Sequence, residues 1–313
     1  MRELAQRAIV FGPDAMLWAH TAGLYASKNQ LAVLREKCNN PVFGYWEGDL
    51  YEAPYKRLPD EVAELASACD VVFVQGFGPM TDELAAAGCT DIRFVPATTD
   101  EWRFGKQHAS APEFDVVLIG TNAASRLPWR TMPGARWRKR LVQLFEKQLG
   151  RRFAVFGHGW HGPSARGPLA FERQSYAYGQ GRLALGVNNL HARYYFSNRL
   201  PIAMSSCVPV IYNYEQGFDS LFPPNSGCMF FRETKQAWDI AHSLLSGDDD
   251  RLIDMGEAAQ HLAFQRFTII KIFHYMCDVL RSYPRCRYHC RRAGAHVMNP
   301  WLDQMSRGVM TNF

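Results

Sequence analysis

One stretch in the middle of the sequence restricts the fold more than any other, because strand, helix and strand follow one another within it. An apolar run at 183–187 predicts the first strand, and a second run at 208–211 predicts another. The small side chains of 200–206 between them favour a short helix, in which Pro201 suits the first turn. Ser197 is placed to accept a hydrogen bond from that turn. The pattern predicts neighbouring parallel strands in an α/β fold.

The same alternation extends over most of the chain. Further strands are predicted at residues 8–12, 42–46, 71–74, 92–96, 114–120 and 152–157. Helices are predicted at residues 14–37, 60–68, 81–87, 136–148, 235–246, 249–262 and 271–283. Strands that alternate with helices imply parallel sheets with right-handed crossovers.

Length and composition agree with two domains. The chain has 313 residues, and its 47% hydrophobic and 21% charged residues suit a globular protein with enough core for two α/β domains. Residues 97–113 carry few apolar side chains and form a candidate link. We therefore predict a short, trimmed Rossmann-like domain at 1–108, a second Rossmann-like domain at 109–283 and a basic tail at 284–313.

Charge and cysteine usage indicate the kind of ligand and the cellular compartment that suit the protein. The net charge of +5 suits an acidic ligand or polymer. The eight cysteines have no C-x-x-C pair and no regular spacing, which favours reduced thiols in a cytoplasmic protein. The N-terminal segment lacks the apolar core of a signal peptide, and no apolar run approaches the roughly 20 residues of a membrane span.

The tail offers two weak signals. Cys286, His289, Cys290 and His296 could be tested as zinc ligands, but their spacing misses the usual zinc patterns, so we expect no metal. Arginines interleaved with aromatic residues in the same tail suit the backbone and bases of nucleic acid. A solvated tail is the simpler interpretation.

Three strand ends of the second predicted domain should meet at one edge of its sheet, where ligands of open α/β sheets bind. Glycines there let backbone N–H groups approach a phosphate, and Arg199 adds a guanidinium at the start of the short helix. The candidate ligand-binding residues at this edge are Gly120, Thr121, Gly157, His158, Gly159, Asn188, Asn189, Ser197, Asn198, Arg199 and Glu215. The alternative is a set of ordinary turns with a capped helix.

Two carboxylates follow the strand predicted at 42–46. A carboxylate at a strand end can take a proton from a hydroxyl group, so Glu47 and Asp49 are candidate bases. Asp49 is preferred because its shorter side chain is easier to hold rigidly. His20 and Asp14, near the first predicted strand, are weaker candidates, and a solvated turn is the alternative for each carboxylate.

Several motifs occur in a characteristic order. They are Asn188-Asn189, Ser197-Asn198-Arg199, the small-residue helix and Val208-Pro209-Val210-Ile211. This order resembles the donor-binding half of GT-B glycosyltransferases, and among them the CgeB-like branch of the family-1-type enzymes, over residues 40–283. In many relatives a glutamate on the small-residue helix holds the nucleotide ribose, and Ile202 stands at that place here.

The resemblance implies a GT-B-like fold of two Rossmann-like domains with a terminal helix that crosses back to the first. It also implies a nucleotide-sugar donor such as a UDP-sugar, transfer to an acceptor hydroxyl, and no required metal or other cofactor. A non-catalytic sugar- or nucleotide-binding protein on the same fold is the alternative. The acceptor stays open between a modified base in DNA and a glycan, as do the sugar and the stereochemical outcome.

Overall fold

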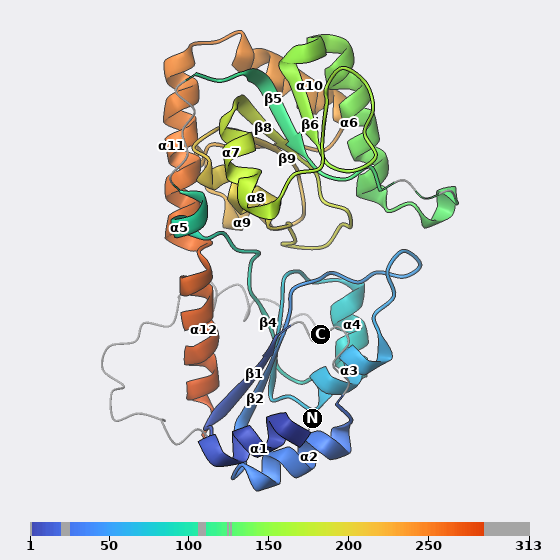
Figure 1. The fold of residues 1–313 in the computed structure, drawn as a ribbon, viewed down its shortest axis with the longest axis vertical. Coiled ribbons are helices and arrows are strands. Elements are labelled where there is room, and N and C mark those ends of the chain that lie inside the picture. The colour runs from blue at the N-terminus through green and yellow to red at the C-terminus, as the bar shows by residue number, and fades with distance from the viewer. Residues whose placement is uncertain (1, 20–25, 106–110, 124, 126, 285–313) are drawn as a thin grey trace. The chain divides into compact units, whose positions relative to one another are not determined.

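The computed structural model describes residues 2–19, 26–105, 111–123, 125 and 127–284 (Figure 1). The chain divides into two compact units, one formed by the described parts of Met1–Pro96 and Ile272–Phe313 and the other by those of Ala97–Lys271. Each unit carries one parallel sheet with helices, which confirms the predicted α/β class of two Rossmann-like units. The boundary between the two units lies after Pro96, whereas the sequence predicts a domain boundary near residue 108.

The first unit is built on a four-stranded sheet in the order β1-β2-β3-β4, all parallel. The strands are β1 (Ala15–Ala19), β2 (Val42–Glu47), β3 (Val71–Val74) and β4 (Ile92–Phe94). The helices are α1 (Arg2–Phe11), α2 (Lys28–Lys37), α3 (Asp60–Ser67), α4 (Pro79–Ala86) and most of α12 (Ile269–Ser282). The central strands β2 and β3 are almost fully buried, as their continuous apolar runs predict.

The start of the chain differs from the prediction. Residues 8–12, predicted as a strand, contain the end of α1, where Ala8 is buried while Val10 and Phe11 are exposed. The single helix predicted at 14–37 is wrong, because its first part is strand β1. The sequence Ala-Met-Leu-Trp-Ala has good helix formers, but pairing with β2 overrides this local preference.

Helix α2 therefore begins later than predicted, at a capping box. The Ser27 hydroxyl accepts from the Gln30 N–H at 3.3 Å, and the Gln30 side chain accepts from the Ser27 N–H at 3.1 Å. This reciprocal pair satisfies two N–H groups that the helix itself leaves unpaired. The Ser-x-x-Gln spacing was a signal for the true start of the helix.

The terminal helix α12 leaves the second unit and packs on the first. Its buried residues Ile272, Met276 and Val279 face the first unit's core, and a Cβ on Gly44 of β2 would approach the Leu280 side chain to 2.9 Å. This agrees with the expected C-terminal crossing helix. Among the described residues, no helix has both the length and the apolarity to cross a membrane.

The second unit carries a six-stranded parallel sheet in the order β10-β9-β8-β5-β6-β7. The strands are β5 (Phe114–Ile119), β6 (Phe153–Phe156), β7 (Ala165–Gly167), β8 (Gly181–Gly186), β9 (Val210–Asn213) and β10 (Cys228–Phe231). The α-helices are α5 (Glu101–Phe104), α6 (Pro133–Leu149), α7 (Gln174–Gly179), α8 (Arg199–Ser205), α9 (Phe218–Leu221), α10 (Thr234–Leu245) and α11 (Asp249–Arg266). The short strands β7 and β10 were missed because three or four residues carry too little pattern.

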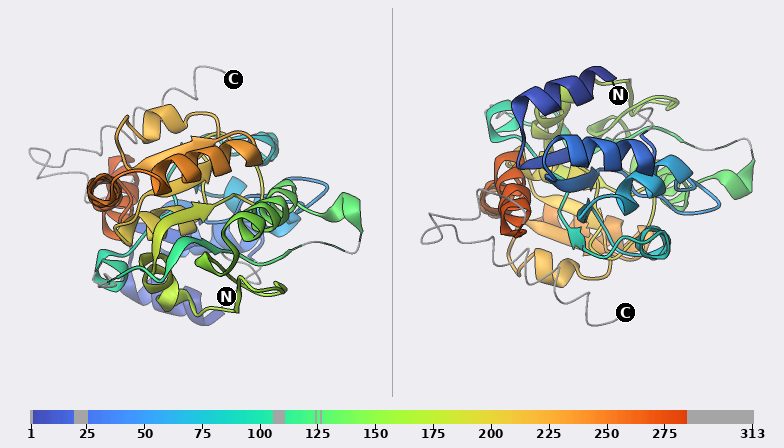
Figure 2. Two further views of the ribbon diagram at one scale, coloured as in Figure 1. Left: turned by 90° about the horizontal axis from the view of Figure 1, so that it is seen from above. Right: turned by 90° about the horizontal axis from the view of Figure 1, so that it is seen from below.

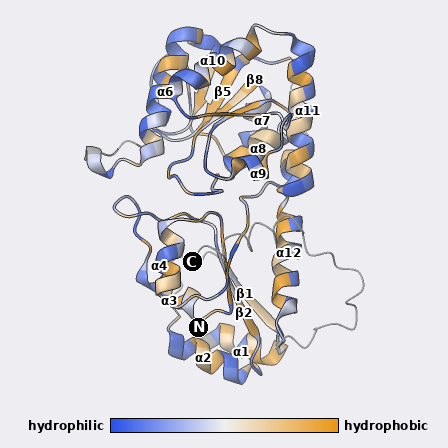
Figure 3. Ribbon diagram, turned by 180° about the vertical axis from the view of Figure 1, so that it is seen from behind, coloured by the Kyte–Doolittle hydropathy of each residue, from blue (hydrophilic) through white to orange (hydrophobic). Residues whose placement is uncertain are grey.

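Helices cover both faces of this sheet (Figure 2). On one face, Leu141 and Phe145 of α6 and Ala241 of α10 pack into one core with β5 and β8. Helices α7 and α8 contact the sheet on the other side. The strands are the most apolar part of the unit, as Figure 3 shows, which explains their uninterrupted hydrophobic runs.

Candidate functional site

The loops after β5 and β6 touch at the carboxyl edge of the second sheet. Gly157 has φ +141°, and a Cβ there would lie 2.3 Å from the Gly120 carbonyl oxygen, so only glycine allows this approach. The Asn122 N–H donates to His158 O at 2.9 Å, and its side-chain amide donates to Gly159 O at 3.0 Å. The structure thus brings together the two glycine-containing segments that the sequence places at one edge.

The side chains of these loops are available at the edge. Thr121 and His158 are exposed. Trp160 closes the turn behind them, because its indole N–H donates to the Gly120 carbonyl oxygen at 2.5 Å. Two exposed polar side chains are therefore held on a fixed backbone.

Asn188, at the end of β8, is the hub of a buried network. Its side-chain N–H groups donate to Tyr195 O at 2.9 Å and to Glu215 Oε1 at 3.3 Å. Its Oδ1 accepts from the Ser197 N–H at 3.1 Å and from the Tyr212 hydroxyl at 2.8 Å. All four positions of the amide are used within the protein. Asn188 therefore positions its neighbours and has no hydrogen bond left for a ligand.

Helix α8 begins differently from the prediction. Its N-cap is the exposed Asn198, which makes no side-chain capping bond, so the expected cap by Ser197 is wrong. The Ser197 hydroxyl instead lies 3.1 Å from the Tyr212 hydroxyl on β9. Ile202, one turn into the helix, is fully buried in the core.

Arg199, at the start of α8, is half-buried. Its guanidinium makes no hydrogen bond or ion pair with any residue that the structure describes. A half-buried cation without an acidic partner is costly in the absence of a ligand. This is the property expected of a residue that receives an anion.

A second arginine at this edge, Arg138 on α6, is 2% exposed. It donates to Thr121 O at 2.8 Å, to Val187 O at 3.2 Å and to Asn189 Oδ1 at 2.7 Å. Burial, and after it the charge of Arg199, lowers the pKa of the Arg138 guanidinium to about 10. No carboxylate of the described residues forms an ion pair with it. Two neighbouring cations therefore lie here without a compensating acid.

Arg138 is not among the site residues predicted from the sequence, although a signal was present. Residues three and seven positions later, Leu141 and Phe145, are on the buried face of α6, so Arg138 shares that face. An arginine in phase with the core of an amphipathic helix indicates a buried, functional or structural charge.

Glu215 and His191 form a second unpredicted pairing at the same edge. The Glu215 side chain is almost buried, and its Oε1 lies 2.6 Å from His191 Nδ1 and accepts from the Asn213 side-chain amide at 2.5 Å. Within the described part of the chain, Glu215 Oε2 makes no hydrogen bond. One carboxylate oxygen is therefore fixed by three donors, and the other stays free to accept.

The carboxylates of the first unit lie at the carboxyl end of β2. Glu47 is 1% exposed and accepts from the Tyr45 hydroxyl at 2.6 Å and from the Asp49 N–H at 2.8 Å. The Asp49 side chain is 47% exposed and lies 2.5 Å from Lys56 Nζ. Glu47 thus fixes the loop that presents Asp49 to solvent.

The two weaker candidates for the base, His20 and Asp14, have different outcomes. His20 lies outside the described residues. Asp14 precedes β1, and its carbonyl accepts from the Val42 N–H at the start of β2, so it lies at the amino edge of the sheet. Its place at a strand end depended on the wrong strand at 8–12, and ligands bind at the opposite edge.

Comparison with known proteins identifies the family. Residues 110–278, more than half of the chain, match a family described as glycosyl transferase-like. The chain belongs to this glycosyl transferase-like family. No curated protein matches it.

Solved structures resemble the glycosyl transferase-like chain over nearly its whole length. HepE of Anabaena, crystallised with UDP, has a TM-score of 0.61 at 13% identity, covering 90% of this chain and 82% of its own. A glycosyltransferase of Rickettsia africae has a TM-score of 0.62 at 11% identity, covering 90% and 79%. The sucrose-phosphate synthase of Thermosynechococcus elongatus has a TM-score of 0.52 at 16% identity, covering 87% and 74%. These likenesses show a GT-B-like fold.

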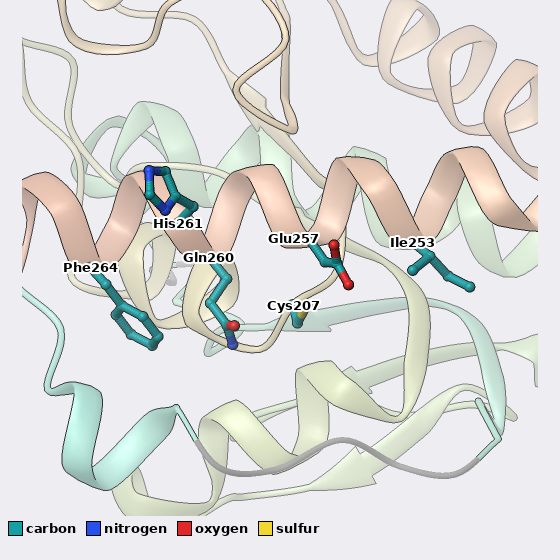
Figure 4. A pocket seen from close by; sticks show the side chains of 6 residues that line it. All are labelled: Cys207, Ile253, Glu257, Gln260, His261 and Phe264. Carbon is teal, nitrogen blue, oxygen red and sulfur yellow. The ribbon is translucent and has the colours of Figure 1, made fainter.

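The glycosyl transferase-like chain also has a pocket away from the carboxyl edge. It measures ≈ 570 Å³ and lies beside α11 (Figure 4). Its lining residues are Cys207, Ile253, Glu257, Gln260, His261 and Phe264. Burial, and after it the charge of Glu257, raises the pKa of the Cys207 thiol. None of the predicted donor-binding residues lines this pocket.

Metal ligands were not expected from the sequence. In the described ranges, no group of three or more His, Cys, Asp or Glu side chains is arranged to hold a metal ion. The four weak candidates of the tail, Cys286, His289, Cys290 and His296, lie outside those ranges.

Proposed function

We propose that this chain is a glycosyltransferase that moves a sugar from a nucleoside diphosphate sugar to an acceptor hydroxyl. The carrying observation is the pair of uncompensated guanidinium groups, Arg138 and Arg199, at the carboxyl edge of a glycosyl transferase-like domain. A diphosphate supplies the missing negative charge, and Arg199 matches its oxygens in a fork. UDP is the first nucleotide to test, because the similar HepE structure contains it.

The roles of the other edge residues follow from their places. Gly120, Gly157 and Gly159 allow a close backbone approach, with Thr121 and His158 as exposed donors. Asn188 and Asn189 hold the edge in shape, and Ser197 with Asn198 leads into α8. Stabilisation of the leaving diphosphate by guanidinium groups needs no metal, so none is part of the proposal. The order of these motifs supports placement in the CgeB-like branch.

Glu215 is our proposed contact to the sugar. Its Oε1 is held by His191, Asn188 and Asn213. Its Oε2 therefore stays free to accept a hydrogen bond from a hydroxyl of the donor sugar. Glu215→Gln is expected to leave UDP affinity within about twofold but to weaken binding of the matching UDP-sugar about tenfold, the loss of a charged hydrogen bond. Calorimetry with UDP and a panel of UDP-sugars measures both. An equal loss for UDP and UDP-sugar would place Glu215 away from the sugar.

The central test is UDP binding to Arg199→Ala. Loss of a charged hydrogen bond to the diphosphate should cost about 1.5–3 kcal/mol, or roughly 10- to 150-fold in Kd. Arg251→Ala, an exposed arginine on α11, is the matched control and should bind as the wild type does. Unchanged UDP affinity in Arg199→Ala would remove Arg199 from the site.

The acceptor and the rival function need a separate experiment. A non-catalytic binding protein would bind UDP-sugar without turnover, so release of UDP from a panel of nucleotide sugars separates the two. A mass-spectrometric screen that offers DNA with modified bases and glycans identifies the acceptor. The six cysteines of the described residues are unpaired, which supports a cytoplasmic setting as part of the proposal.

A further inference from the structure

The positive charge of this protein is concentrated in one segment. Residues 126–152 contain nine Arg and Lys and one acidic residue, a net charge of +8. The whole chain has a net charge of only +5, so the remaining residues are net negative together. Such a concentration on one helix and the segments on either side of it creates a local field far stronger than the net charge indicates.

Four of these cations lie on the outside of α6, and three of them, Arg136, Arg140 and Lys147, follow one row along the helix. Arg136, Lys139, Arg140 and Lys147, which we call the α6 stripe, are exposed. The helical period puts them opposite the buried Leu141 and Phe145. At 1.5 Å per residue the stripe is about 17 Å long.

No acidic side chain interrupts this line within α6. The helix has one acidic residue, Glu146, and its Oε1 accepts from the Ser164 hydroxyl at 2.6 Å and from the Ser164 N–H at 3.1 Å. Glu146 is therefore committed to the loop before β7, to one side of the stripe. The row formed by Arg136, Arg140 and Lys147 therefore contains no acidic side chain of α6.

An exposed tryptophan precedes the stripe. Trp129 lies in the 3₁₀ turn η1 (Pro128–Arg130), which projects from the second unit in Figures 1 and 2, and 65% of its surface is exposed. The turn is ordered by its own hydrogen bonds: the buried Thr131 hydroxyl accepts from Ser125 N–H at 3.0 Å, and Arg130 N–H donates to Leu127 O at 2.9 Å. A large aromatic ring is thus held out in solvent a few residues before the first cation of the stripe.

We propose that the α6 stripe and Trp129 bind a single strand of nucleic acid. A polyanion with phosphates at regular intervals matches cations in a line, and guanidinium groups match phosphate oxygens. An exposed aromatic ring is the platform on which an unpaired base stacks. A membrane surface is flat and would need apolar side chains along the stripe. The large apolar side chains exposed near it are Leu127 and Trp129, which both precede it at one end.

The stripe starts at the candidate donor edge. The Gly134 N–H, in the first turn of α6, donates to Asn189 O at 3.0 Å, and a Cβ on Gly134 would overlap the Asn188 carbonyl. A bound strand would therefore run away from the edge that we assign to the donor. The binding inference itself does not depend on glycosyl transfer, and its test contains no nucleotide sugar.

The test measures binding of a fluorescent oligo-dT to the full chain over a range of salt concentrations. Each phosphate contact on a single strand contributes about −0.7 to the slope of log K against log salt, so R136Q/R140Q/K147Q should make the slope about 2 units shallower. W129A should weaken binding roughly 5- to 150-fold without changing the slope, and W129F should restore most of the loss.

The control variant R57Q/R173Q/R251Q removes the same net charge from exposed sites outside the stripe and should bind oligo-dT nearly as the wild type does. Thermal unfolding checks that every variant is folded. The proposal is overturned if the stripe variant binds like the control, since the affinity then comes from net charge or from the tail. It is also overturned if W129A has no effect, or if phosphatidylserine vesicles bind in place of oligo-dT with the same dependence on the stripe.

Discussion

Arg138→Leu is expected to lower the free energy of unfolding of the second unit by about 3–5 kcal/mol. The substitution leaves the carbonyl groups of Thr121 and Val187 and the side chain of Asn189 without their donor. The buried Val187 carbonyl left unsatisfied costs about 1–3 kcal/mol, and the two part-buried acceptors add to this cost. Removal of a buried charge that no acidic side chain compensates offsets part of this cost. Urea unfolding followed by intrinsic fluorescence gives the difference.

Arg140→Leu is the matched control, because Arg140 is an exposed arginine on the same helix. It should change stability by less than about 0.5 kcal/mol. Arg138→Lys keeps the charge but cannot reach three acceptors in the same fork, so its stability should lie between the two. If Arg138→Leu unfolds within about 1 kcal/mol of the wild type, the three hydrogen bonds do not hold this edge together.

Asp49→Asn is expected to reduce sugar transfer on the order of a hundredfold or more, while UDP affinity stays unchanged. The substitution keeps the shape of the side chain and removes its basicity. Asp49 is the exposed carboxylate of its loop, and the Glu47 carboxylate fixes its backbone N–H. Steady-state transfer to the acceptor identified by the screen, with calorimetry of UDP binding, tests both parts.

Glu47→Gln is the companion variant. Glu47 is buried with both oxygens engaged, so its loss should act through stability and loop position. The expected signature is a lower unfolding temperature with a smaller loss of turnover. An inactive Glu47→Gln beside a normal Asp49→Asn would transfer the role of base to Glu47. Normal turnover in both would place the base elsewhere, with His20 the next candidate.

The local sequence pattern predicted the strands in which every residue is buried. Residues 114–119 are apolar except for Asp115, and all six are buried in β5. A central parallel strand must be apolar on both faces, so its sequence carries the information by itself. The same reason explains β3, and the glycines after β5 and β6 were identified because close approach excludes a side chain.

Contacts between segments that are distant in the sequence decided features that the local pattern could not predict. Residues 15–19 have the composition of a helix, yet they form β1 because β2 offers hydrogen bonds and Trp18 becomes buried. Ser197 has the residue type of a cap, but Tyr212 on β9 lies close enough to bind its hydroxyl. In each case the competing partner is distant in sequence, so no local signal could report it.

Local sequence pattern was therefore enough to predict the parallel α/β class, the edge where strand ends meet and the candidate Arg199. Which charges are compensated depends instead on how distant segments pack together. This packing placed Arg138 on backbone carbonyls without an acid and joined His191 to Glu215 across 24 positions. Burial is encoded in the period of one segment, whereas the partner of a buried charge depends on which segments the fold brings together.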